Sequence, residues 1–427
     1  MIPCNEAYNS FISRIFPEFG VTSSDDTPRE VRSVTFQVTE KCNLKCTYCY
    51  QHNKTCNAMS FDTAKEFVDL LLHDKIPYCN TTNAVGIVVE FIGGEPFIEI
   101  ELVDKITSYI VDQMLILNHP WKNLYKFSFS SNGTLYFDPR VQEYLAKYKD
   151  LISLSISIDG NKELHDACRL FEDGRGSYDV AIKASLDWIN KTSIHGSTKM
   201  TLAPDNIRYI YDATVNLIQL GYDIIMLNCV YEDVWSPDDA RLMYKELCRV
   251  SDYLFENNLH DKIFFRLFED NIGNPMCPED DKNYCGGTGS MIALDWQGNV
   301  YPCLRYMPSS IGCSREPYAI GKIQNGEFVQ STEHEQRVKC FDCITRRSQS
   351  TDECFNCPIA SGCGWCSAYN YECFGTPNKR STGICVMHKA RCLASYEFWK
   401  RYNEVMGIDE EVVCNLKPEW IAEIKGN

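Results

Sequence analysis

The sequence predicts an α/β protein with a largely parallel sheet, followed by a smaller cysteine-rich domain. Between residues 34 and 260, short apolar runs alternate six times with longer amphipathic stretches, which is typical of strands joined by helices. Fourteen of the 23 cysteines lie from Cys277 onward, and this change in composition marks a domain boundary. Six strand–helix units can close partly as a barrel or lie open as a doubly wound sheet.

The elements follow from the period of the apolar residues in each stretch. Strands are expected at 34–38, 85–92, 127–131, 154–158, 199–202 and 224–230. Helices are expected at about 59–73, 98–117, 138–150, 177–189, 207–220 and 237–258. After residue 264 the pattern changes to short strands and turns, with a hairpin at 290–301 that turns at Gln297-Gly298-Asn299. A closing helix is expected at about 389–406.

These elements divide the chain into four parts and place it among soluble proteins. The parts are an irregular segment at 1–30, the strand–helix domain at 31–260, the cysteine-rich domain at 261–392, and a C-terminal helix and tail at 393–427. The sequence has no secretory signal and no apolar run of about 20 residues, so we expect a cytoplasmic protein without a membrane anchor. The cysteines are then expected to be reduced and available to metal, rather than paired as in a secreted protein. The net charge of −16 argues against a nucleic-acid partner.

A cysteine motif follows the first predicted strand. Cys42, Cys46 and Cys49, with spacing C-x3-C-x2-C, can hold three corners of a [4Fe–4S] cluster and leave the fourth iron free to bind a ligand. The loops Gly93–Pro96, Asn132-Gly133 and Asp159-Gly160 also directly follow predicted strands. Because parallel strands end at one edge of a sheet or barrel, these loops are expected to collect at one rim.

The rim offers groups that complement a ligand with an amine, a carboxylate and a nucleoside. Glycines allow backbone carbonyls to approach an ammonium, a glutamate attracts it, and an arginine pairs with a carboxylate. A serine can bond a ribose hydroxyl, and aromatic rings can pack beside an adenine. Taken singly, the Gly93–Pro96 loop is better explained as a turn and Arg169 as a surface ion pair, whereas the concentration of these groups on one rim indicates a site. The residues in question are Tyr48, Tyr50, Gly93, Gly94, Glu95, Ser157 and Arg169.

Together these features resemble the radical S-adenosylmethionine (SAM) enzymes that carry a C-terminal SPASM domain. The resemblance rests on Cys42–Tyr50, on Gly93–Pro96, and on Ser157–Gly160 followed by His165-Asp166-x2-Arg169. It implies a partial (β/α)6 TIM-like barrel, followed by a domain with a β-hairpin and short helices. It also implies that a reduced cluster cleaves SAM to a 5′-deoxyadenosyl radical, which takes hydrogen from the substrate. The SAM contacts that the resemblance implies are Tyr48, Gly94, Glu95, Ser157, Arg169 and, near the adenine, Val230.

The later cysteines are similar to the SPASM signature. Their spacing is C-x12-G-x4-C from Cys285 and C-x2-C-x5-C-x2-C from Cys354. In the second pattern, two residues precede the last cysteine, where the signature usually has three. By resemblance, one auxiliary [4Fe–4S] cluster is held by Cys354, Cys357, Cys363 and Cys385. A second is held by Cys285, Cys303 and Cys366, with Cys277 as fourth ligand, so that the chain would carry three clusters. The spacing alone fits zinc equally well.

One further pair of cysteines, Cys340 and Cys343, has no assigned role. The pair could replace a ligand, bind a separate metal or carry a redox function.

The resemblance implies a peptide or protein substrate. We expect a precursor peptide that contains cysteine, crosslinked through a thioether, with the cluster and SAM as the only assigned catalytic groups. Sulfatase maturases carry an aspartate at the position of Leu304, where it acts as the base that takes up a proton. An aliphatic side chain cannot take a proton, which argues against formylglycine formation. That reaction, carbon–carbon crosslinking and oxidative decarboxylation remain alternatives, as does a non-catalytic metal-binding interaction protein.

Two partners besides the substrate are expected. About forty residues precede Cys42, too few for a leader-binding domain, so a separate leader-binding protein or the barrel surface would hold the leader. A flavodoxin or ferredoxin would donate electrons.

Overall fold

The six predicted strands are all present in the computed structural model, which describes residues 31–76, 86–192, 196–232, 234–281, 285–312 and 315–426. The predicted segment 1–30 and the first residue of the strand predicted at 85–92 lie outside these ranges. The strands are β1 (Val31–Thr39), β3 (Gly86–Gly93), β4 (Tyr125–Ser131), β5 (Ile152–Ile156), β7 (Ser197–Leu202) and β8 (Ile224–Cys229). Neighbours pair in parallel in the order β1-β3-β4-β5 and again as β7-β8, where β9 (Phe264–Phe265) follows.

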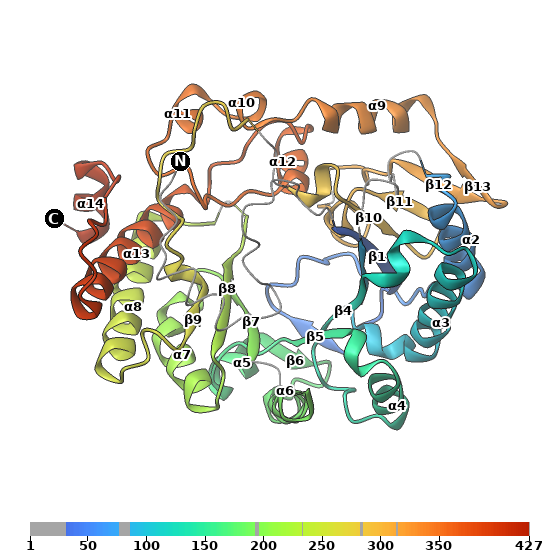
Figure 1. Ribbon diagram of the computed structural model, residues 1–427, viewed down its shortest axis with the longest axis horizontal. Helices are drawn as coiled ribbons and strands as arrows, with labels where there is room; N and C mark the ends of the chain where they lie inside the picture. Colours follow the sequence, from blue (N-terminus) through green and yellow to red (C-terminus); the bar gives the residue numbers. More distant parts are fainter. Residues whose placement is uncertain are drawn as a thin grey trace.

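Helices connect the strands and lie outside them, as Figure 1 shows. They are α2 (Phe61–Leu72), α3 (Ile100–Ile116), α4 (Pro139–Lys147), α5 (Lys162–Cys168), α6 (Tyr178–Thr192), α7 (Ile210–Gln219) and α8 (Pro237–Glu256). Between β5 and β7, the Thr198 hydroxyl donates to the Ile158 carbonyl at 3.0 Å, so the two sheets adjoin although these strands do not pair. The result is a partial barrel of six strands, which confirms the predicted fold class.

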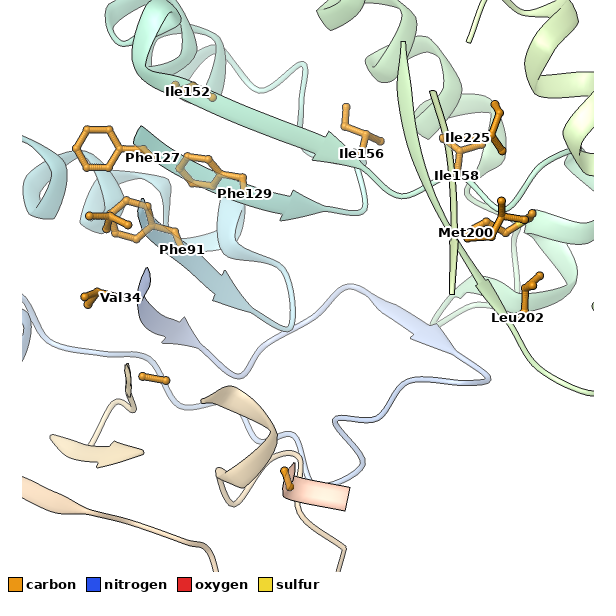
Figure 2. Close-up of a cluster of buried hydrophobic side chains, with 14 of the residues drawn as sticks. Val34, Phe91, Phe127, Phe129, Ile152, Ile156, Ile158, Met200, Leu202 and Ile225 are labelled. Atoms are coloured by element: carbon orange, nitrogen blue, oxygen red, sulfur yellow. The ribbon is translucent and has the colours of Figure 1, made fainter. Parts of the chain in front are cut away.

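Side chains alternate along the strands, with apolar residues toward the helices and polar residues toward the interior of the barrel. Phe36 packs edge-on against Phe67 of α2, with ring centroids 5.4 Å apart, and Phe129 packs against Tyr144 of α4 at 5.7 Å. Figure 2 shows this apolar layer running from β1 to β8. Thr35, Glu90, Ser128 and Ser153 point the other way and stand in register across four strands. The interior of the barrel is therefore polar.

The predicted hairpin is confirmed, and it extends the barrel sheet. Its strands are β10 (Met291–Leu294) and β11 (Asn299–Tyr301), and β10 pairs in parallel with β1. Two more antiparallel strands, β12 (Gly321–Gln324) and β13 (Glu327–Val329), complete an eight-stranded sheet. The two domains are thus joined through a continuous sheet, which the sequence patterns did not predict.

The C-terminal helices close the structure. They are α9 (Thr332–Asp342), α10 (Arg346–Gln349), α11 (Asp352–Phe355), α12 (Ser367–Phe374), α13 (Cys385–Met406) and α14 (Pro418–Lys425). Helix α13 passes through residue 392, where the sequence pattern suggested a boundary, and packs on α8 with Phe398 5.3 Å from Phe255. Within the described ranges, no helix has the length and apolar character needed to cross a membrane.

Candidate functional site

The motif cysteines, Cys42, Cys46 and Cys49, lie in a loop that leaves the carboxyl end of β1. Within this loop, β2 (Leu44–Cys46) pairs with β6 (Arg169–Phe171), so that Cys46 stands opposite Arg169. The Asn43 side chain donates to the Thr134 hydroxyl at 2.8 Å and thereby ties the loop to the end of β4. The motif is therefore fixed to two other segments at the predicted rim.

The three motif thiols are neighbours, and two cations lie beside them. A negative charge on Cys42 or Cys49 raises the pKa of Cys46, so the three sulfurs share one environment. Burial is the largest cause of the raised pKa of Cys46, about 11, and Arg169 opposes it. The Lys54 ammonium lies 3.5 Å from the Cys49 sulfur. Thiols must lose their protons to bind iron, and adjacent cations favour that loss.

The glycine-rich loop after β3 packs directly on the motif. A Cβ atom at Gly94 would lie 2.4 Å from the Lys41 carbonyl oxygen and 2.5 Å from the Cys42 Cβ. The Gly94 and Glu95 amides donate to the Thr39 and Lys41 carbonyls at 3.2 and 2.9 Å. Only glycine fits at position 94, because any side chain would push the first motif cysteine away.

Glu95 is buried and joins the ends of β3 and β4. Its carboxylate accepts hydrogen bonds from the Ser131 hydroxyl and the Asn132 amide, both at 2.8 Å, and from the Phe97 amide at 3.2 Å. Burial raises the pKa of Glu95 to about 7 despite these three donors. The carboxylate therefore fixes two rim loops in relation to the motif, and its contact with SAM stays a prediction.

Glu95→Gln is expected to flatten the pH dependence of stability. Between an ordinary pKa of 4.5 and about 7, the folded protein keeps a proton that the unfolded chain releases. The contribution of Glu95 to the free energy of unfolding should therefore be largest below pH 4.5. It should fall as the pH rises from 4.5 to 7, by at most about 1.4 kcal/mol per pH unit. Glutamine does not titrate. Urea denaturation of both metal-free proteins at pH 5 and 7 measures the difference, and equal pH dependence would contradict the assignment.

Arg169 is held by a buried ion pair that the sequence did not predict. Its Nε atom lies 2.7 Å from Oδ2 of Asp159, whose side chain is fully buried. The Tyr48 hydroxyl donates to the same carboxylate, and the Arg169 guanidinium lies 5.4 Å from the centre of the Tyr48 ring. These groups fix β6 against β2 beside Cys46. Contacts of Tyr48 and Arg169 with SAM stay predictions.

Tyr50 links the motif to the C-terminal domain. The Arg305 guanidinium lies 4.9 Å from the centre of its ring and forms an ion pair with Glu232 at 2.9 Å. Charges on both Cys49 and Cys303 raise the pKa of Tyr50, although burial is the largest cause. Tyr50 therefore lies close to both the last motif cysteine and Cys303, which follows the hairpin.

The first C-terminal cysteine group consists of Cys285, Cys303 and Cys366. Burial is the main cause of the raised pKa of Cys303, and charges on the other two raise it further. Arg305 lowers the pKa of Cys366, whose burial raises it. The three predicted ligands are thus brought together, with Arg305 beside them. The Cys277 thiol is exposed and lies 2.6 Å from the Glu279 carboxylate, so its role as fourth ligand stays a prediction.

The second C-terminal cysteine group brings its four predicted members together. It consists of Cys354, Cys357, Cys363 and Cys385. The pKa of Cys385 is raised to about 11, mainly by burial, and charges on the other three raise it. Gly362 precedes Cys363 with φ +71°, and a Cβ there would lie 2.3 Å from Ile272, so this turn requires glycine.

Cations surround the second group. Arg380 lowers the pKa of Cys363, Lys389 lowers that of Cys385, and Lys417 lowers that of Cys357, in each case against the larger effect of burial. Such an arrangement favours thiolates.

The remaining predicted contacts lie at strand ends. The Ser157 amide donates to the Ser131 carbonyl at 2.9 Å, and the Val230 amide donates to Leu202 at 2.9 Å. Sequence reasoning missed Lys54, Arg305, Glu232 and the pairing role of Asp159. Asp159 belongs to a loop that the sequence analysis named, and Arg305 follows Leu304. No residue spacing in the sequence predicted their ion pairs with Arg169 and Glu232.

The cysteine groups carry the donors that a cluster requires. Each group includes a thiol whose pKa a nearby cation lowers, and thiols bind iron as thiolates. The metal held by the two C-terminal groups stays a prediction.

Comparison with known proteins finds a family match that covers part of the chain. Residues 36–213 match the Radical SAM superfamily. The protein MJ0907 of Methanocaldococcus jannaschii is 35% identical over 193 residues, which cover 45% of this chain and 60% of that protein. The match with radical SAM cyclopropyl synthase TigE of Paramaledivibacter caminithermalis is weaker, at 22% identity, but covers 86% of this chain and 73% of TigE.

A solved structure shares the fold. Native anSMEcpe with bound AdoMet and Kp18Cys peptide has a TM-score of 0.60 and 17% identity, and the match covers 87% of this chain and 99% of that one. The cysteine motif and most of the partial barrel lie within residues 36–213, the part of the chain that is similar to the Radical SAM superfamily.

Proposed function

We propose that the protein is a radical SAM peptide maturase that forms a thioether crosslink from a cysteine of its substrate. Cys42, Cys46 and Cys49 would hold the cluster that binds SAM, and the two C-terminal cysteine groups would hold auxiliary clusters. Bound together, the cluster and SAM supply a hydrogen-abstracting radical when an electron is delivered. The similar structure with AdoMet and a peptide bound supports both the cofactor and the class of substrate.

The observation that carries the proposal is the position of Tyr50. It directly follows Cys49, and its ring packs 4.9 Å from the guanidinium of Arg305, two residues after Cys303, so the motif cysteines and the first C-terminal group adjoin the same region. That region adjoins the polar barrel interior, because the charge of Glu90, which is in register with Thr35 and Ser128, also affects Tyr50. A peptide with polar backbone groups suits such a surface.

The residues around this region would bind and orient the peptide. Arg305 has donors suited to a peptide carbonyl or carboxylate, and its pairing with Glu232 holds the guanidinium in place. Three thiols stand together in the first C-terminal group, whereas Cys277, which the sequence predicts as the fourth ligand, is exposed and donates to Glu279, so the fourth position is open to the substrate. The substrate cysteine is the proposed occupant, and this supports thioether formation over the other modifications.

The test is anaerobic incubation of the reconstituted protein with SAM, dithionite and cysteine-containing peptides encoded beside its gene. We expect release of 5′-deoxyadenosine and a product that has lost two hydrogens per crosslink. The crosslinked cysteine should no longer react with iodoacetamide. Loss of carbon dioxide, or a product whose cysteines all remain alkylatable, would contradict thioether formation. No release of 5′-deoxyadenosine would contradict the maturase proposal itself.

A further inference from the structure

Cys340 and Cys343 form a close pair at the C-terminal end of α9. Cys340 lies in the last turn of the helix and is partly buried, whereas Cys343 caps the helix and is exposed. The Cys343 amide donates to the Cys340 carbonyl at 3.2 Å, which closes a tight turn between them. A negative charge on Cys343 raises the pKa of Cys340, so the two sulfurs are neighbours. Neither residue belongs to the three cysteine groups described above.

The surroundings of the pair are aromatic. Burial raises the pKa of Cys340 and the neighbouring Tyr318 hydroxyl lowers it, and the Tyr318 ring packs 5.6 Å from Phe341. Tyr318 also packs 5.2 Å from Tyr306. Burial raises the pKa of Tyr306, and negative charges on the three cysteines of the first C-terminal group raise it further, so its hydroxyl lies near that group. Two packed rings therefore separate this surface pair from the first C-terminal group.

A separate metal site does not suit the pair. Zinc in a structural site takes four protein ligands, and iron–sulfur clusters take three or four thiolates. Cys340 and Cys343 supply two thiolates, fewer than either kind of site needs. Two adjacent thiols, one of them open to solvent, are instead the arrangement of a thiol–disulfide exchange centre.

We propose that Cys340 and Cys343 form a reversible disulfide by exchange with a disulfide in solution or on a partner protein. The exposed Cys343 thiolate attacks the incoming disulfide, forms a mixed disulfide and releases one thiol. Cys340 then attacks Cys343, which forms the internal bond and releases the second thiol. Both cysteines lose their protons, and the incoming disulfide takes up the two electrons and the two protons. This step needs neither SAM nor a cluster, so it stands independently of the proposed function.

The backbone geometry permits this bond. A disulfide requires Cα atoms no more than about 7 Å apart, and a turn closed by a hydrogen bond between residues i and i+3 meets that limit. The residues between the two cysteines, Phe341 and Asp342, end the helix, so a small tightening of its last turn disturbs no interior helical hydrogen bond. Phe341 is buried against Tyr306 and Tyr318, so oxidation would act on the layer beside the first C-terminal group.

The sequence allows a direct test, because trypsin cleaves after Lys339 and Arg346 and releases both cysteines in one peptide, Cys340–Arg346. The full-length reconstituted protein is equilibrated anaerobically with glutathione buffers from fully reduced to mostly oxidised, then blocked with iodoacetamide and digested. In reducing buffers we expect the doubly alkylated peptide. In oxidising buffers we expect an unalkylated peptide whose mass is two hydrogens below that of the reduced peptide. The disulfide form should become the main form of this peptide in the most oxidised buffer.

Two variants separate the proposed steps. Cys340→Ser should accumulate a stable mixed disulfide with glutathione at Cys343, because the second thiol is missing. Cys343→Ser should react with oxidised glutathione at least about tenfold more slowly, because Cys340 is partly buried. Cys373, an exposed cysteine on α12, serves as the reference for an isolated thiol. The proposal is overturned if the wild-type peptide stays doubly alkylated in oxidised glutathione, or if it gains only glutathione adducts as Cys373 does.

Discussion

Replacing the three motif cysteines together by alanine is expected to reduce the reductive cleavage of SAM more than about 100-fold. Loss of even an outer partner of a metal ligand typically costs 10–100-fold, and here all the proposed protein ligands of the cluster that binds SAM are removed. Iron should fall by about four atoms per chain, while the two C-terminal groups keep theirs. The readouts are 5′-deoxyadenosine after addition of dithionite and the iron content of the anaerobically reconstituted protein.

The matched control is Cys56→Ala. Cys56 is exposed and follows the motif in the same loop region, so its removal should leave both readouts within about twofold of the wild type. A triple variant that still releases 5′-deoxyadenosine at the wild-type rate would refute the assignment of the motif. A triple variant that loses all its iron would instead contradict the independent loading of the C-terminal cysteine groups.

The sequence was sufficient to predict the barrel, because its strands carry a strong pattern. In β1, the buried apolar residues Val34, Phe36 and Val38 alternate with Thr35 and Gln37, and an amphipathic helix follows. Strands β2 and β6 could not be predicted in the same way. Each has only three residues, and their pairing depends on tertiary contacts around Arg169 rather than on periodicity.

The candidate site was only partly predictable for a related reason. Cysteine spacing indicated which thiols belong together, since metal ligands near in sequence share a loop. Contacts between segments that are distant in the chain produce no spacing pattern in the sequence. Arg305 reaches Tyr50 across 255 positions in the chain, and Gln37 of β1 donates to Ser309 at 2.8 Å across 272. These contacts bring the hairpin against the motif, and they became visible only in the folded chain.

Arg169→Ala is expected to lower the free energy of unfolding by about 3 kcal/mol. Removing one partner of a buried ion pair typically costs 3–5 kcal/mol, because the other charge is left unpaired. Asp159 is fully buried and the Arg169 side chain is 10% exposed, so water cannot replace the guanidinium without opening the structure. The low end of the range applies because the Tyr48 hydroxyl still donates to Asp159. Urea denaturation of the metal-free protein measures the change.

Two comparisons show whether the effect comes from the unpaired charge. Arg140→Ala removes an exposed pair with Asp138, so the urea midpoint should stay within experimental error of the wild type. The double variant Arg169→Ala, Asp159→Ala removes both buried charges and should be more stable than Arg169→Ala alone. A single variant within 1 kcal/mol of the wild type would mean that the pair does not hold β6 against β2. In that case the position of Cys46 would depend on the hydrogen bonds of the motif loop alone.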